Sequence, residues 1–255
     1  MSVDNRISGR LALITGASGG IGAACARDLY KQGVHLALTY LKSKQNVDNL
    51  VSELQALSVE GPKTSIHQAD MASALDLTRL FGEINEKHGH HPDMIVSNAG
   101  YGIRTPNILD ISIEEFDRTI SINLRASFIL TKLAVPHMKS QKWGRIIFMG
   151  SISGYGGGIA GCNYAASKAG LMGMAKNLAQ KLAKDRITVN DVAPAMIGDT
   201  GMIPDSKFVE GTPGDVRNIP VGRLGTPQEV ANVVTMLCKT GYLTGQSILL
   251  SGGLK

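Results

Sequence analysis

Short apolar segments alternate with longer helical stretches along this chain, and this alternation constrains its fold more than any other feature. The apolar segments are typical of buried strands, and the stretches between them have the length and periodicity of helices. The predicted strands are 10–15, 34–40, 64–67, 94–96, 145–148, 187–189 and 247–250; the predicted helices are one ending near residue 32 and those at 43–57, 72–88, about 113–138, about 163–184 and 227–237. Strands that alternate with helices form a parallel sheet covered on both faces through right-handed crossovers. We therefore predict an α/β, doubly wound fold with a seven-stranded parallel sheet.

The length and composition of the chain favour a single domain. Its 255 residues are 43% hydrophobic and include 30 glycines, which suits one full core with many tight turns. We expect one domain over residues 1–255, without repeats or linkers. Residues 196–223 are irregular, with Pro204, Pro213 and Pro220 among polar residues. A long loop in a compact domain is usually functional, so we expect a lid over a site here.

Charge and targeting signals exclude several classes of function. The net charge is +5, but the 26 basic residues form no dense run and aromatic residues make up only 5% of the chain. Binding to nucleic acid is therefore not expected. No apolar run reaches the roughly 18 residues of a membrane span, and the first residues resemble no targeting peptide. We expect a soluble, cytoplasmic protein with no membrane partner.

The cysteines and clustered histidines do not indicate a disulfide or a metal site. Cys25, Cys162 and Cys238 are far apart and lack the spacing of a zinc site. The segment from His88 to His91 contains three histidines beside a glycine, without an acidic or cysteine partner at ligand spacing. A solvated turn is the preferred interpretation, and no metal is expected.

A glycine-rich segment joins the first predicted strand to the first predicted helix. Backbone N–H groups and the positive helix end can hold a pyrophosphate there, and glycines let the backbone approach closely. The spacing is Gly-x-x-x-Gly-x-Gly, which departs from the commoner Gly-x-Gly-x-x-Gly pattern, and a glycine turn with only packing duties is the alternative. The residues expected to bind the cofactor here are Gly16, Ser18, Gly20, Ile21 and Gly22.

The end of the second predicted strand bears on the choice between NAD and NADP. An acidic residue there would bind the ribose 2'-hydroxyl of NAD and repel the 2'-phosphate of NADP. The sequence after Tyr40 has no acid but offers Lys42, Ser43 and Lys44, which favours NADP. Either lysine could equally be a solvated residue at a helix start. Asp70, after the third strand, is a candidate for the adenine edge or for a helix cap.

Tyr164 and Lys168 lie four residues apart, on one face of a predicted helix. A nearby ammonium favours the phenolate, and so draws the pKa of a tyrosine down from about 10 toward neutrality. Tyr164 is therefore a candidate acid for protonating a carbonyl oxygen. The same spacing also arises by chance on solvated helices.

Several motifs, taken in order, resemble those of the short-chain dehydrogenase/reductase family over essentially the whole chain. Within the family, the chain looks most like 3-oxoacyl-[acyl-carrier-protein] reductases, on residues 150–151, 163–164 and 244–246. The motifs are Thr15 to Gly22, Asn98-Ala99-Gly100, Asn123, Ser151, Tyr164 with Lys168, and Gly252-Gly253. The resemblance implies a Rossmann fold that binds a dinucleotide and carries out catalysis in one domain, and a homotetramer.

The resemblance also implies roles for four catalytic residues. Ser151 would hydrogen-bond the substrate oxygen, and Tyr164 would donate the proton. Lys168 would hold the nicotinamide ribose and lower the pKa of the tyrosine, while Asn123 would support a water that re-protonates the lysine. Two alternatives stay open: Ser153 is a competing hydroxyl, although its spacing to the tyrosine favours Ser151, and Asn123 could simply bend or cap a helix.

Further residues would line the cofactor pocket. Asn98, Ala99 and Gly100 follow a strand directly, although a plain turn would look the same. Ile197 and Thr200 would lie near the nicotinamide. Two departures from the family pattern bear on this site: Ala195 replaces a usual glycine, which leaves the register around Thr200 open, and Gly19 stands where many NADP-dependent relatives carry a basic residue.

These features together predict an oxidoreductase that uses NADPH to reduce a ketone to a secondary alcohol. The expected substrate is a small carbonyl compound, most plausibly a 3-oxoacyl thioester carried on CoA or acyl carrier protein, as in fatty acid biosynthesis. Alternative substrates are a polyol, a steroid or a polyketide intermediate. A protein that senses the dinucleotide without turnover is a more distant alternative, because a pure binder would not need an acid over the nicotinamide.

Overall fold

The computed structural model describes residues 4–57 and 61–255. Seven strands form one sheet in which every pairing is parallel. The strands are β1 (Leu11–Ile14), β2 (His35–Tyr40), β3 (Thr64–Gln68), β4 (Met94–Ser97), β5 (Gly144–Met149), β6 (Ile187–Pro194) and β7 (Ser247–Leu250). The predicted seven-stranded parallel sheet is confirmed.

Helices connect the strands and cover both faces of the sheet. The α-helices are α1 (Gly20–Lys31), α2 (Lys44–Ala56), α3 (Ala74–His88), α4 (Ile113–Ile120), α5 (Ala126–Ser140), α6 (Cys162–Leu182) and α7 (Pro227–Lys239). Short 3-10 turns lie at Ile108–Asp110, Ile152–Tyr155, Ala183–Asp185, Lys207–Val209 and Val216–Asn218. Within the described ranges, no helix is long and apolar enough to cross a membrane.

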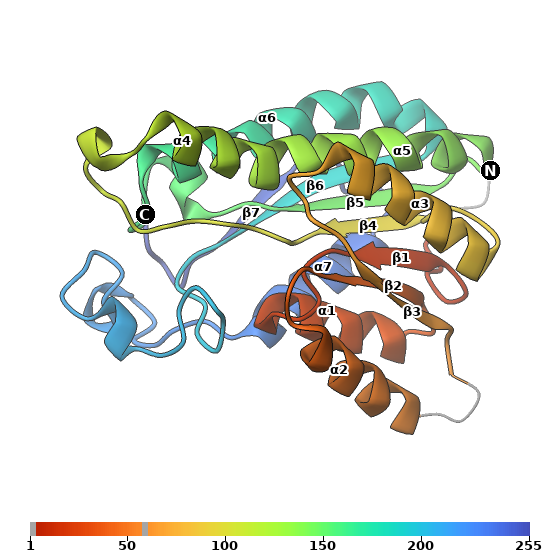
Figure 1. Cartoon of the computed structure of the whole chain (residues 1–255), viewed down its shortest axis with the longest axis horizontal. Coiled ribbons are helices and arrows are strands. Elements are labelled where there is room, and N and C mark those ends of the chain that lie inside the picture. Colours follow the sequence, from red (N-terminus) through yellow and green to blue (C-terminus); the bar gives the residue numbers. More distant parts are fainter. Residues whose placement is uncertain (1–3, 58–60) are drawn as a thin grey trace.

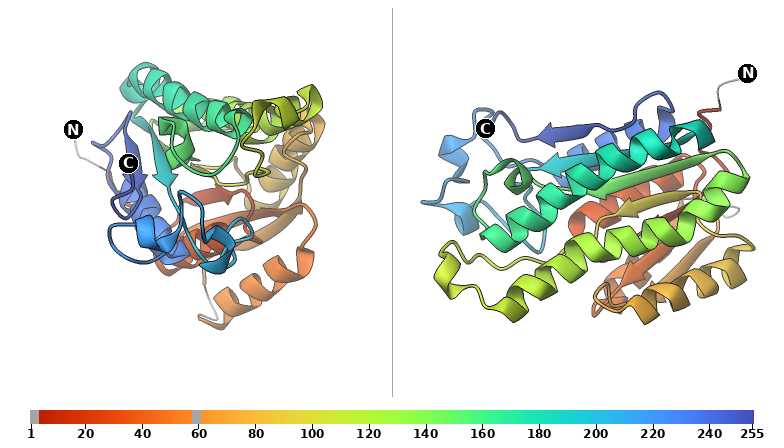
Figure 2. Two further views of the ribbon diagram at one scale, coloured as in Figure 1. Left: turned by 90° about the vertical axis from the view of Figure 1, so that its left-hand side faces the viewer. Right: turned by 90° about the horizontal axis from the view of Figure 1, so that it is seen from above.

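Two apolar layers hold the helices against the sheet (Figures 1 and 2). On one face α1, α2 and α7 pack through buried side chains such as Leu29, Val47 and Val234. On the other face α3, α5 and α6 pack through residues such as Leu80 and Leu130. Because both faces are covered, the strands are apolar on both sides, and this accounts for the continuous hydrophobic runs in the sequence.

The strand order is β3-β2-β1-β4-β5-β6-β7, so the chain reverses direction across the sheet between β1 and β4. The loops after β1 and β4 therefore diverge at the carboxyl end of the sheet, which is where ligands bind in doubly wound folds. Residues 196–223 follow β6 and lie at this same end of the sheet (Figure 1). The topology places the predicted site at the carboxyl edge.

Two elements differ from the prediction. The single helix expected over about 113–138 is interrupted by a π-helical turn, Ser121–Arg125, between α4 and α5. Asn123 lies inside this turn, and π-turns are frequent at functional sites. Strand β6 continues to Pro194, well beyond the predicted end at residue 189. Asn190 and Asp191 interrupt its apolar run, which hid the length of the strand, yet both are buried.

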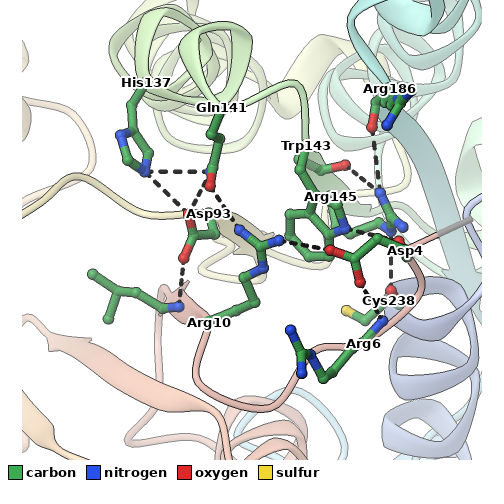
Figure 3. A network of polar contacts seen from close by, with 12 residues as sticks. Asp4, Arg6, Arg10, Asp93, His137, Gln141, Trp143, Arg145, Arg186 and Cys238 are labelled. Atoms are coloured by element: carbon green, nitrogen blue, oxygen red, sulfur yellow. Dashed lines mark hydrogen bonds and ion pairs between the residues drawn. The ribbon is translucent and has the colours of Figure 1, made fainter. Parts of the chain in front are cut away.

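A polar network at the amino edge ties the N-terminal segment to the sheet (Figure 3). Trp143 is sandwiched between two guanidinium groups, with the Cζ atoms of Arg10 and Arg145 each 4.3 Å from its ring centroid. Its indole N–H donates to the carbonyl of Asp4 at 3.0 Å. Cation–π contacts and this hydrogen bond therefore anchor the segment from Asp4 to Arg10, far from the carboxyl edge.

The histidine segment does not form the solvated turn that the sequence favoured. His90, Asp93 and His137 bring one ligand atom each within 4.8 Å of one another, so an acidic partner is present. The buried Asp93 accepts hydrogen bonds on both oxygens, from the Leu11 N–H and from the side chains of His137 and Gln141 (Figure 3). The carboxylate thus already has structural partners, and we assign no ligand to this cluster.

Candidate active site

A cavity of about 660 Å³ opens at the carboxyl edge of the sheet. Three of the predicted site residues, Lys42, Ser43 and Asn123, are not among its lining residues. The other predicted residues all line it: Gly16, Ser18, Gly20, Ile21, Gly22, Tyr40, Asp70, Asn98, Ala99, Gly100, Ser151, Tyr164, Lys168, Ile197 and Thr200. Residues from six strand ends and from α6 therefore converge on one cavity.

The glycine loop at the start of α1 has the features of a phosphate cradle. Gly19 occupies the N-cap, and no side chain caps the helix, so backbone N–H groups at its start stay available to a ligand. Gly22 must lack a side chain, because a Cβ there would lie 2.8 Å from Nδ2 of Asn98 and still closer to the carbonyl of Gly16. The residues present therefore fit a dinucleotide pyrophosphate.

Asn98 joins the two loops that diverge from β1 and β4. Its side-chain Nδ2 donates to the carbonyl of Thr15 at 2.8 Å, and its backbone N–H donates to Thr15 Oγ1 at 3.0 Å. The N–H of Ala99 donates to the same hydroxyl at 2.9 Å. The 98–100 segment is therefore more than a plain turn, because it fixes the floor of the cavity beside the glycine loop.

Two lysines follow the end of β2, and only one of them is held in an ion pair within the described part of the chain. Lys44 pairs with Asp48 at 2.8 Å, one helical turn along α2. Lys42 is exposed, and its ammonium has no hydrogen bond or ion pair with the described part of the chain. Between Tyr40 and Lys44 there is no acidic residue. Lys42 is thus the cation that could meet a phosphate beside Tyr40.

Asp70 caps a turn and not the helix that follows. Its carboxylate accepts from the N–H of Ala72 at 2.9 Å, whereas the N-cap of α3 is Ser73, which accepts from the N–H of Asp76. The helix-cap alternative for Asp70 is therefore wrong. Asp70 lines the cavity, so its proposed contact with a cofactor stays a prediction.

Tyr164 and Lys168 lie on one face of α6, as the spacing predicted, and both are buried. The Lys168 ammonium lies 5.4 Å from the centroid of the Tyr164 ring. Burial raises the pKa of Tyr164 to about 12, and a hydrogen bond with Ser151 acts in the opposite direction. The pKa of Tyr164 therefore shifts upward, opposite to the predicted lowering, because desolvation of the phenolate dominates.

Lys168 is held at the tip of β5. Its Nζ donates to the carbonyl of Met149 at 2.7 Å. Burial lowers the pKa of this lysine to about 8, and the nearby Asp191 acts against that shift. Lys168 is thus close to losing its charge within the pH range in which enzymes work. Asp191 was not among the predicted site residues, although an acid inside an apolar strand is a signal that could have found it.

Ser151 and not Ser153 is the hydroxyl that meets Tyr164. Ser151 ends the loop after β5 and hydrogen-bonds the phenol. Its Oγ also accepts from the N–H of Ser153 at 3.2 Å, which begins the 3-10 turn Ile152–Tyr155. The backbone turn therefore aims one hydroxyl at the phenol and fixes its position.

Asn123 is buried behind the cavity, with its side chain fully engaged. Its Oδ1 accepts from the N–H of Tyr101 at 2.8 Å, and its Nδ2 donates to the carbonyl of Tyr101 and to Ser167 Oγ. The amide thus clamps the loop after β4 onto α6. The support of a water beside Lys168 by Asn123 stays a prediction.

The 196–223 segment closes one side of the cavity with apolar side chains. Met202 Sδ lies 4.0 Å from the Tyr164 hydroxyl, a contact that the sequence did not reveal. Thr200 holds the turn beneath it, because its Oγ1 donates to the carbonyl of Ile197 and accepts from the N–H of Ile203. Thr200 lines the cavity, as predicted, with its hydroxyl engaged in this turn.

Comparison with known proteins identifies the family. Residues 10–207 match the short chain dehydrogenase family. The chain belongs to this family. It is 37% identical over 252 residues to the 3-oxoacyl-[acyl-carrier-protein] reductase FabG of Rickettsia bellii, covering 97% of this chain and 98% of that protein. It is 34% identical over 256 residues to the FabG reductase of Thermotoga maritima, covering 98% and 99%.

A solved structure supports the same assignment. The short-chain dehydrogenase/reductase from Serratia marcescens superposes with a TM-score of 0.87 at 31% identity, covering 98% of this chain and 99% of that one. This short-chain dehydrogenase is therefore an oxidoreductase that acts on CH–OH and C=O groups with a nicotinamide dinucleotide. The predicted resemblance and Rossmann fold are confirmed.

Proposed function

We propose that this protein uses NADPH to reduce a 3-oxoacyl thioester, carried on acyl carrier protein or CoA, to the 3-hydroxyacyl product. One observation carries the proposal: Ser151, Tyr164 and Lys168 meet in the same cavity as the uncapped glycine loop. The reductases of Rickettsia bellii and Thermotoga maritima bear this activity in their names. The reaction would belong to fatty acid biosynthesis in the cytoplasm.

The chain's own residues would orient the substrate and move one proton. The cofactor would supply the hydride. Ser151 would donate a hydrogen bond to the carbonyl oxygen, where negative charge develops. Tyr164 would then transfer its proton to that oxygen, because an alkoxide is a stronger base than even a buried phenolate. Lys168 would hold the nicotinamide ribose and stabilise the phenolate that remains.

The cavity wall supports an acyl substrate. The apolar side chains that line the cavity include Ile103, Ile159, Met202 and Phe208. Such a surface suits the hydrocarbon part of an acyl chain. Arg104 also lines the cavity and is exposed, so it could meet an anionic carrier at the entrance. A polyol would gain little binding energy from these apolar side chains.

Two further proposals concern the cofactor and the assembly. The absence of an acid between Tyr40 and Lys44, together with the unengaged Lys42, supports NADPH over NADH.

We also propose a homotetramer, because Ile113 and Phe116 on α4 and Phe128 on α5 are exposed apolar side chains that an interface would cover. Analytical ultracentrifugation tests this, and a monomeric mass would contradict it.

The decisive experiment is the rate of NADPH oxidation with an acetoacetyl thioester, compared with NADH and with the Tyr164→Phe variant. We expect turnover with NADPH that collapses in the variant. A wild-type protein that binds NADPH and reduces simple diketones, yet leaves the thioester untouched, would refute the substrate class while keeping the reductase chemistry.

A further inference from the structure

A buried carboxylate interacts electrostatically with Lys168. Asp191 is in the middle of β6, is 0% exposed, and neighbours Phe148 of β5 and Ser247 of β7 in the sheet register. A carboxylate in such a setting is costly unless a charge or hydrogen bonds compensate it. The described residues give its Oδ1 no hydrogen-bond partner. Fold stability alone therefore does not explain an acid at this position.

The lack of a side chain at Gly150, next to Ser151, leaves room for this carboxylate. A Cβ on Gly150 would lie 2.7 Å from Asp191 Oδ2 and closer still to Oδ1. Gly150 separates Met149, whose carbonyl accepts from Lys168, and Ser151, which hydrogen-bonds Tyr164. The acid thus lies directly against the segment that positions both catalytic partners of Tyr164.

Asp191 is held by a short chain of hydroxyl groups. Ser247 Oγ donates to Asp191 Oδ2, and the hydroxyl of Tyr155 donates to Ser247 Oγ at 2.8 Å. Tyr155 is half-exposed and belongs to the 3-10 turn that begins after Ser151. Both donors favour the ionised carboxylate, so the chain of hydroxyls supports a negative charge in the core.

Lys168 on α6 is the charged group that interacts electrostatically with this carboxylate. Three other segments pack against the carboxylate. Gly150 follows β5, Ser247 belongs to β7, and the 3-10 turn brings the titratable Tyr155, which acts through Ser247. Burial raises the pKa of Asp191 to about 6, while the Ser247 hydrogen bond and Lys168 act against this shift. Each of these two groups therefore influences the protonation of the other.

We propose that Asp191 is a positioning residue that keeps Lys168 protonated and so sets the pH range in which Tyr164 can deliver its proton. The carboxylate supplies a fixed negative charge that opposes the loss of the Lys168 proton. As the carboxylate itself becomes protonated at lower pH, this support disappears. The proposal rests on the proposed ketone reduction only for its kinetic readout.

The direct test is an NMR titration of the full-length protein without substrate. Protein labelled with ¹³C at lysine Cε gives the titration midpoint of Lys168, assigned by its disappearance in Lys168→Met. We expect the midpoint to fall by about one pH unit in Asp191→Asn. The control Asp110→Asn, an exposed acid away from the cavity, should leave the midpoint in place. Equal midpoints in wild type and Asp191→Asn would overturn the proposal.

A second variant guards against misfolding of the first. Ser247→Ala removes the donor to Asp191 and leaves the carboxylate in place, so the Asp191 midpoint, followed by ¹³Cγ aspartate signals, should rise above its wild-type value. No movement in Ser247→Ala would show that the hydroxyl chain does not hold the charge and would overturn this part of the proposal.

The kinetic readout uses the pH dependence of kcat/KM for whichever ketone the wild type reduces. The alkaline fall in activity, where Lys168 loses its proton, should begin about one pH unit lower in Asp191→Asn. A shifted NMR midpoint with an unchanged pH profile would refute control of catalysis. If the wild type reduces no ketone, the proposed function fails, and the NMR titration alone still decides whether Asp191 sets the lysine charge.

Discussion

The ammonium of Lys168 lies 5.4 Å from the centre of the Tyr164 ring, and both side chains are buried on the same face of α6. Burial raises the pKa of the tyrosine to about 12 and lowers that of the lysine to about 8. The phenol therefore stays protonated over the whole neutral range, as an acid must before it acts.

Replacing the acid should abolish reduction without loss of cofactor. Tyr164→Phe removes the transferable proton and leaves the ring that packs against Gly102. We expect kcat to fall about 10²- to 10⁴-fold, the usual contribution of a positioned acid. NADPH binding, measured by fluorescence titration, should change little. A variant that retains more than a tenth of the wild-type kcat would contradict the assignment.

A single methyl group added at Gly22 in the glycine loop should weaken cofactor binding. In Gly22→Ala, the new Cβ would crowd Nδ2 of Asn98 and the carbonyl of Gly16. We expect the dinucleotide Kd to rise at least tenfold, and the free energy of unfolding to fall by about 1–3 kcal/mol.

The matched control for the loop is Gly173→Ala, in the exposed middle of α6. No atom lies within 4 Å of the position its Cβ would take. Alanine should stabilise this helix by about 1 kcal/mol and leave cofactor binding as it was. Similar Kd values for the two variants, from isothermal titration calorimetry, would argue against a phosphate cradle at Gly22.

The unengaged lysine at the end of β2 should set the preference for NADPH. Lys42→Glu places a negative charge where the 2'-phosphate is expected, so the KM for NADPH should rise tenfold or more while that for NADH changes little. Lys44→Gln is the control, because that ammonium already pairs with Asp48. Equal effects of the two substitutions on NADPH would show that neither lysine contacts the phosphate.

Ionisation of the buried Asp191 carboxyl should lower the free energy of unfolding at neutral pH. Burial raises its pKa to about 6, above the ordinary 3.8, so the folded state binds a proton more tightly than the unfolded state. The stability associated with this group is complete below the ordinary pKa and is lost as pH rises through about 6. Asp191→Asn, which cannot ionise, should therefore unfold with a free energy on the order of 2–3 kcal/mol higher than wild type at pH 7.

The measurement is urea unfolding of Asp191→Asn and wild type from pH 4 to pH 8. The difference in free energy of unfolding should grow as pH rises toward 7 and then stay level. A difference that is constant across this range would show that the carboxylate does not titrate as its burial requires.

Much of the fold was predictable because its signals are local. A strand such as β1 is recognised by its short apolar run. A helix such as α7 is recognised by the helical periodicity of its apolar residues and by the residues that begin and end it. The predicted helix over about 113–138 was wrong at one place, since the π-turn around Asn123 depends on hydrogen bonds to Tyr101 in a distant loop. Such contacts leave no periodic trace in the sequence.

The sequence by itself determined the alternating fold, the glycine loop and the pairing of Tyr164 with Lys168, because each depends on spacing along a strand, a turn or one helical turn. Only the tertiary structure decided the direction of the tyrosine pKa shift, since desolvation depends on everything packed around the ring. It also brought Asp191 beside Lys168 and His137 beside Asp93. Those pairs join residues far apart in the chain, and only the folding of the sheet and its helices into one body creates them.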